Sequence, residues 1–202
     1  MSGAAPSPRQ SAGPRRSVVR GVVRLATGHS DGLTQFGDTP DAFLASLAPL
    51  VAFPLVGALL MLMGGGGLAA LTDFLATLCA LLAPPVLSRE VAQVWGCAAR
   101  WTRFAVAFNW CQWAIPLVAS LLVVLAGILL SLGVPNDVCL AVVVAGLAAY
   151  GLWLHWFLAH HGLGLSRIRA AALVFGVNFV TVCLVLGPRL LIMALSGGAA
   201  GL

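Results

Sequence analysis

The chain has 202 residues, of which 60% are hydrophobic and only 8% are charged, and its formal net charge is +5. A soluble domain carries about 25% charged residues, so this composition excludes an ordinary water-soluble enzyme domain. The chain contains 11 arginines and no lysine. Its bias toward Ala, Gly, Leu, Val and Arg is typical of a GC-rich bacterial genome. The sequence predicts one membrane domain preceded by an N-terminal arm.

Residues 1–32 form the predicted arm, which is basic and cytoplasmic and contains a short amphipathic helix at 18–26. Valines recur on one face of this helix, and Arg16, Arg20 and Arg24 line another face. Such helices lie on membrane surfaces, where arginines attract anionic lipid headgroups. A flexible basic arm explains the same residues equally well. A mitochondrial presequence is a further alternative, because the stretch before Asp31 is rich in arginine and contains no acidic residue.

Five long apolar stretches follow in the membrane domain at 33–202. Each reaches about 20 residues, the length that an α-helix needs to cross about 30 Å of hydrocarbon. A helix satisfies its own backbone hydrogen bonds in lipid, so we predict an all-α, polytopic membrane bundle of five transmembrane helices. The predicted spans are about 42–63, 67–87, 104–132, 138–160 and 169–195.

Cap and proline residues mark the predicted ends of the spans. Thr39-Pro40-Asp41 supplies a cap, a proline at the first helical position and an acid in the first turn of span one. Pro84-Pro85 predicts a kink or an end in span two. Span three is about 43 Å long as a straight helix, so it should tilt, bend at Pro116 or extend into the interface. Ser166 is expected to cap span five.

The arginines are distributed unevenly between the two sides of the membrane. All of them except Arg189 lie in the arm, in the loop between spans two and three, or in the loop between spans four and five. With five spans these three regions share one side, and the positive-inside rule assigns that side to the cytoplasm. We predict a multi-pass protein of the bacterial inner membrane with a cytoplasmic N-terminus and a periplasmic C-terminus.

Polar residues inside the spans indicate where a function would lie, because they are costly in lipid. Four of them lie at a similar depth near the cytoplasmic face: Asn109, Gln112, His155 and Asn178. They predict either a small polar pocket with His155 as its titrating group, or interhelical hydrogen bonds that hold the bundle together. At least two of Asn109, His155 and Asn178 should share a pocket or lie within hydrogen-bonding reach.

Two charges lie well inside the spans near the opposite face. Asp73 belongs to span two and Arg189 to span five, and each is about six residues from the outer end of its span. A salt bridge between them would lower the cost of both charges and tie the two spans together. Snorkelling of either charged group to water is the alternative.

Catalytic and metal-binding patterns are absent from the sequence. The only glutamate, Glu90, lies in a loop, so the paired ligands of an intramembrane metalloprotease are missing. No CxxC, GxSxG or Walker motif occurs. We therefore expect no catalysis, no cofactor, no metal and no nucleic-acid partner. The expected partners are the lipid bilayer, anionic lipid headgroups at the arm, and an unidentified membrane protein.

Several local features also suggest a family. They are Gly37-Asp38-Thr39-Pro40 with Phe43, the aromatic residues ahead of Pro116, Gly162-Leu163-Gly164-Leu165-Ser166, and Ala170-Ala171-Ala172. Over about 33–195 the chain resembles a divergent bacterial member of the Yip family, the Rab/Ypt-interacting integral membrane proteins. The resemblance implies a non-enzymatic membrane scaffold or trafficking-type role. The alternative is a small permease or accessory transporter subunit that uses the intramembrane polar cluster.

Overall fold

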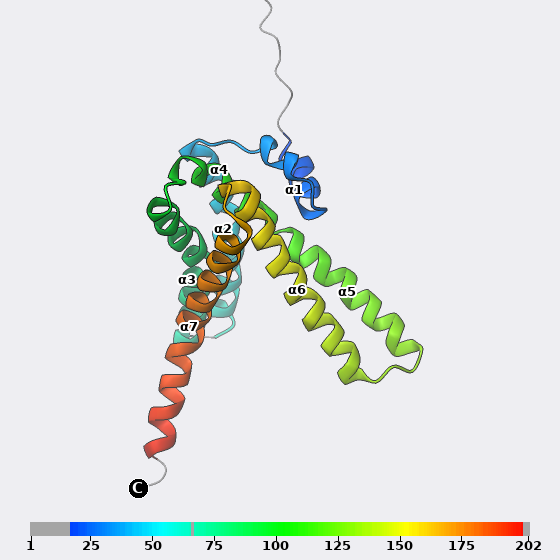
Figure 1. Ribbon diagram of the computed structural model, residues 1–202. Helices are drawn as coiled ribbons and strands as arrows, with labels where there is room; N and C mark the ends of the chain where they lie inside the picture. Colours follow the sequence, from blue (N-terminus) through cyan, green and yellow to red (C-terminus); the bar gives the residue numbers. More distant parts are fainter. Residues whose placement is uncertain (1–16, 66, 200–202) are drawn as a thin grey trace, which may run out of the picture.

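The computed structural model describes residues 17–65 and 67–199, with side chains described for all of these except 68, 69 and 188–199. Every regular element in this part of the chain is a helix, which confirms the predicted all-α fold class (Figure 1). In chain order the elements are α1 (Val18–Ala26), the 3₁₀ helix η1 (Ser30–Gln35), α2 (Pro40–Met63), α3 (Gly67–Val94), α4 (Ala98–Cys111), α5 (Ala114–Ser131), α6 (Asn136–Leu163) and α7 (Arg167–Ala199).

Five helical segments in the described residues are long and apolar enough to cross a membrane. They are α2, α3, the pair α4 and α5, α6, and α7, and each coincides with one predicted span. The predicted amphipathic helix at 18–26 is present as α1. The chain is therefore an all-helical, multi-pass membrane protein with a short amphipathic helix ahead of its spans.

The helix ends agree with the sequence at two caps and differ at one proline pair. Thr39 caps α2 and Ser166 caps α7, as predicted. Of the two alternatives at Pro84-Pro85, a kink or an end of span two, the end is wrong, because α3 continues through both prolines to Val94. Proline removes a backbone hydrogen bond, but membrane helices tolerate it where neighbouring helices and serine side chains satisfy the freed groups.

The third predicted span is broken into two helices at Gln112-Trp113. Pro116 has no N–H, and in a continuous helix its ring would clash with the carbonyl of Gln112. The chain forms shorter hydrogen bonds instead, from the Trp113 N–H to the Trp110 oxygen and from the Ile115 N–H to the Gln112 oxygen, both 3.2 Å. The expected bend therefore lies one turn ahead of Pro116.

The spanning helices form two groups that diverge from one end of the molecule (Figure 1). We call α2, α3 and α7 the three-helix leg, because α3 packs against both of the others. We call α5 and α6 the hairpin leg, in which α5 packs mainly along α6. Helix α4 contacts α2, α3 and α6 where the two legs meet. We call this region, with α1, η1 and the adjoining helix ends, the shared end.

The hydrophobic core lies at the shared end. Helix α4 is buried over half of its length, and its side chains pack with residues from α1, α6 and α7. Leu25 and Leu158 are fully buried there, and Phe36, which follows η1, is also buried. Gly21 of α1 lies against the Phe36 ring, where a Cβ would come within 2.7 Å of the ring carbon. This contact holds α1 and η1 against each other.

Candidate functional site

Asn109 links α4 to α2 inside the shared end. Its side chain is buried, and its Nδ2 donates a 3.0 Å hydrogen bond to Oγ of Ser46. The Ser46 hydroxyl in turn donates to the Phe43 carbonyl at 2.7 Å. This chain of hydrogen bonds satisfies the amide donor within the protein, so Asn109 acts as a link between helices. The sequence did not point to Ser46, because a helical serine usually bonds to a carbonyl of its own helix.

Gln112 links the break between α4 and α5 to α6. Its Nε2 lies 3.4 Å from Nε2 of His155. An amide nitrogen can only donate, so the contact requires Nε2 of His155 to be unprotonated. The imidazole also packs on Phe108, with 4.8 Å between the ring centroids. Phe108 of α4 and Gln112 at the break thus orient the His155 ring.

Asn178 of α7 bonds to its own helix, with its Nδ2 donating to the Val174 carbonyl at 2.8 Å. Asn178 and His155 both line a cavity of about 40 Å³ between α3, α4, α6 and α7, which Pro84-Pro85 close on one side. His155 and Asn178 thus line the same cavity, and His155 lies beside Gln112. Asn109 instead forms a hydrogen bond with Ser46, so the four residues do not form a single cluster.

Trp113 is a further polar group at the break that the cluster prediction did not include. Its indole Nε1 is buried and has no hydrogen-bond partner among the described residues. Its ring packs edge-on against Phe53 of α2, with 5.0 Å between the centroids. The ring therefore fills space between α2 and the start of the hairpin leg, at the cost of an unsatisfied donor.

The predicted ion pair of Asp73 and Arg189 falls partly outside the described residues. Asp73 lies in the first half of α3, and Arg189 lies in α7, but the Arg189 side chain is not described. The two helices pack along each other in the three-helix leg. The ion pair itself remains a prediction.

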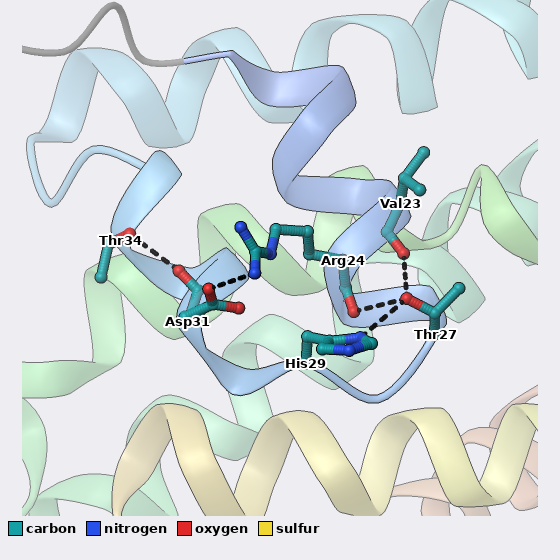
Figure 2. Close-up of polar contacts among 6 residues, drawn as sticks. All are labelled: Val23, Arg24, Thr27, His29, Asp31 and Thr34. Atoms are coloured by element: carbon teal, nitrogen blue, oxygen red, sulfur yellow. Dashed lines mark hydrogen bonds and ion pairs between the residues drawn. The ribbon is translucent and has the colours of Figure 1, made fainter.

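One arginine of the basic face of α1, Arg24, is bound by an acidic residue of the protein, Asp31 (Figure 2). Nη2 of Arg24 forms an ion pair with Oδ2 of Asp31 at 2.6 Å. Thr27 donates to the carbonyls of Val23 and Arg24, at 2.8 and 3.1 Å, and closes the turn into η1. Of the other two predicted arginines, Arg20 is exposed and Arg16 lies outside the described residues.

Helix α1 presents two different apolar edges. Leu25 belongs to the hydrophobic core and Val18 and Val22 pack against it, whereas Val19 and Val23 are 74% and 57% exposed. The valines therefore do not form one membrane-facing surface. The hydroxyl of Tyr150 in α6 also donates to the carbonyl that ends α1, that of Ala26, at 3.2 Å. Helix α1 is thus a packed part of the membrane domain.

All arginines with described side chains lie at the shared end. Nη2 of Arg103 pairs with Oδ2 of Asp38 at 2.6 Å, which ties α4 to the segment ahead of α2. The guanidinium of Arg89 lies over the Trp101 ring, 5.5 Å from its centroid. Among the described residues no three His, Cys, Asp or Glu side chains are grouped so as to hold a metal ion.

These features define a multi-pass membrane protein in which two hydrogen bonds between spanning helices, Asn109 to Ser46 and Gln112 to His155, lie where the two legs meet. Comparisons of the chain with protein-family models, with curated protein sequences and with solved structures find no match.

Proposed function

We propose that the protein is an integral membrane scaffold or interaction protein of Yip-like type that carries out no catalysis. The observation that supports this most is a row of small, exposed side chains on α6. Ala141, Ala145 and Ala149 recur every four residues along the hairpin leg, and all three are exposed. Small residues at this spacing let helix backbones approach closely and are enriched where membrane helices associate. This face of α6 therefore suits a partner transmembrane helix.

The alternative, a small permease or accessory transporter subunit, requires a path for a solute. The cavity beside His155 and Asn178 holds about 40 Å³, which is room for a few water molecules. Ligand sites usually measure about 300–1,000 Å³. Asn109 and Gln112 form hydrogen bonds to other helices. The intramembrane polar groups thus serve helix packing, which supports the scaffold over the permease.

The test is a photo-crosslinker placed on two adjacent faces of α6 in cells. A benzoylphenylalanine at Ala145 should give a discrete adduct with a membrane protein, whereas one at Val144, which is 58% exposed, should give lipid adducts. Ala145→Leu should abolish the complex, and Val144→Leu should leave it intact. Lipid adducts alone at both positions would contradict the proposal. A solute flux in proteoliposomes that His155→Ala abolishes would favour the permease.

We also propose that the shared end faces the cytoplasm of a bacterial cell and that α1 meets anionic lipid headgroups there through Arg20. The gathering of the described arginines at that end supports this orientation under the positive-inside rule. A reporter that is active only in the periplasm should give signal when fused to Leu202 and none when fused after Arg103. Signal at both sites, or at neither, would contradict the orientation.

A further inference from the structure

A second, larger cavity lies at the shared end, away from the intramembrane polar residues. It measures about 320 Å³ and opens between the turn that joins α3 to α4 and the turn that joins α6 to α7. This volume falls at the lower end of the range for ligand sites, about 300–1,000 Å³. Two arginines, Arg100 and Arg169, line it together with Ser166, and none of its described lining residues is acidic. The cavity is therefore positively charged.

The two arginines lie on different walls of this cavity. The Arg100 guanidinium lies against Gly164, in the space that a Cβ of residue 164 would occupy. Gly164 also has a φ of +69°, a conformation that glycine adopts readily. The Arg169 guanidinium lies over the Trp95 ring, 5.9 Å from its centroid. Within the described part of the chain, the ion pairs use Arg24 and Arg103, and neither cavity arginine has a carboxylate partner.

Specific hydrogen bonds hold both turns in place. His160 Nδ1 donates to the Leu165 carbonyl at 2.6 Å, and Trp156 Nε1 donates to the Arg167 carbonyl at 3.1 Å. The Cys97 N–H bonds back to the end of α3 at 2.8 Å. Helices α4 and α7 both begin at the cavity, and α4 begins without a side-chain cap. Helix N-termini carry partial positive charge, which adds to the field of the two arginines.

We propose that this cavity binds a phosphate group through Arg100 and Arg169. A guanidinium donates two parallel N–H bonds to phosphate oxygens, and two of them on different walls can hold one phosphate between them. Basic pockets between transmembrane helices are a known mode of binding phospholipid headgroups. A water-soluble phosphate has the same chemistry, so the experiment must separate the two sources.

The experiment uses the full chain in dodecyl maltoside, with binding measured by native mass spectrometry and by the shift of the thermal midpoint. The probes are dioleoyl phosphatidylglycerol, inorganic phosphate, and dioleoylglycerol, which has the same acyl chains without phosphate. We expect at least one phosphate-bearing probe to bind and to raise the midpoint, and dioleoylglycerol to do neither. Arg100→Gln and Arg169→Gln should each weaken binding about tenfold, the loss expected for a charge-assisted hydrogen bond.

Arg167→Gln is the matched control, because Arg167 begins the same helix as Arg169 but does not line the cavity. It should change the affinity less than about twofold. If Arg100→Gln does not fold, Arg169→Gln and Arg169→Lys carry the test, and the lysine variant should retain part of the binding. Binding of the lipid alone identifies a headgroup site, and binding of inorganic phosphate identifies a soluble ligand. Equal losses in Arg167→Gln and Arg169→Gln, equal binding of dioleoylglycerol, or no binding of either phosphate probe would overturn the proposal.

Discussion

The shared end and the hairpin leg are stabilised in different ways. At the shared end, side chains from α1, α4, α6 and α7 bury one another, and hydrogen bonds such as Asn109 to Ser46 cross between helices. In the hairpin leg, only Ala126 and Cys139 are buried between residues 115 and 153. Its helices satisfy their own backbone and present apolar side chains outward, as lipid requires. Packing between side chains thus stabilises the shared end, whereas the hairpin leg depends on the surrounding lipid for its stability.

Removing a core side chain from the shared end should have the largest effect. Leu158→Ala, at a position that is fully buried, should lower the free energy of unfolding in detergent by about 2–5 kcal/mol, because it leaves a cavity. The matched control is Leu140→Ala, on the hairpin leg, where the side chain is 61% exposed and little should change. Equal losses in the two variants would show that both regions depend on side-chain packing alike.

The next largest effect is expected in the three-helix leg, at Asp73 and Arg189. Breaking an ion pair in a partly apolar setting leaves one charge poorly compensated. Asp73→Ala and Arg189→Ala should each lower the free energy of unfolding by about 2 kcal/mol, somewhat less than the roughly 2.5–3.5 kcal/mol that an isolated Asp or Arg costs at the centre of a membrane helix. The double variant should be no worse than the poorer single one, since both remove the same interaction. Fully additive losses in thermal melts would show that the two charges are solvated independently.

A smaller effect is expected for the hydrogen bond between Asn109 and Ser46. Interhelical hydrogen bonds in membrane proteins contribute about 0.6 kcal/mol on average and up to about 1.7 kcal/mol. A double-mutant cycle of Asn109→Ala and Ser46→Ala, measured by unfolding in sodium dodecyl sulfate, should give a coupling energy in the upper part of this range because the pair is buried. A coupling of zero would show that the two side chains act independently.

The smallest effect is expected at the surface of α1. Arg24 and Asp31 are 43% and 54% exposed, and surface ion pairs contribute about 0–1 kcal/mol. Asp31→Asn should therefore change the thermal midpoint only slightly, and added salt should remove the difference from the unsubstituted protein. A large, salt-insensitive loss would mean that the turn between α1 and η1 is part of the core.

The sequence predicts the spans well because each rests on a local pattern. A run of apolar residues, a Thr39-Pro40 start and a Ser166 cap act through neighbouring residues, and the structure has all three. The divergence of the two legs has no such local signal. It depends on where α4 stops, and Pro116 indicates only that span three bends, not in which direction the following hairpin leaves.

The candidate sites show the same limit. The sequence identifies Asn109 and His155 because polar residues are rare in lipid, but their partners depend on how the helices pack. The positively charged cavity escapes sequence reasoning for a different reason. In the sequence Arg100 and Arg169 indicate only membrane topology, and they line one cavity only because two turns that are distant in sequence lie side by side.

The hairpin leg also has a consequence for membrane insertion. Between Ala114 and His155 the only Asp, Glu or Arg residue is Asp137, next to the turn that joins α5 to α6. If the shared end faces the cytoplasm, as proposed above, insertion of this pair of helices carries one carboxylate across the hydrocarbon, while the arginines of the shared end stay on the cytoplasmic side. Since α5 packs mainly on α6, it can insert together with α6 as a helical hairpin before α7 is synthesised.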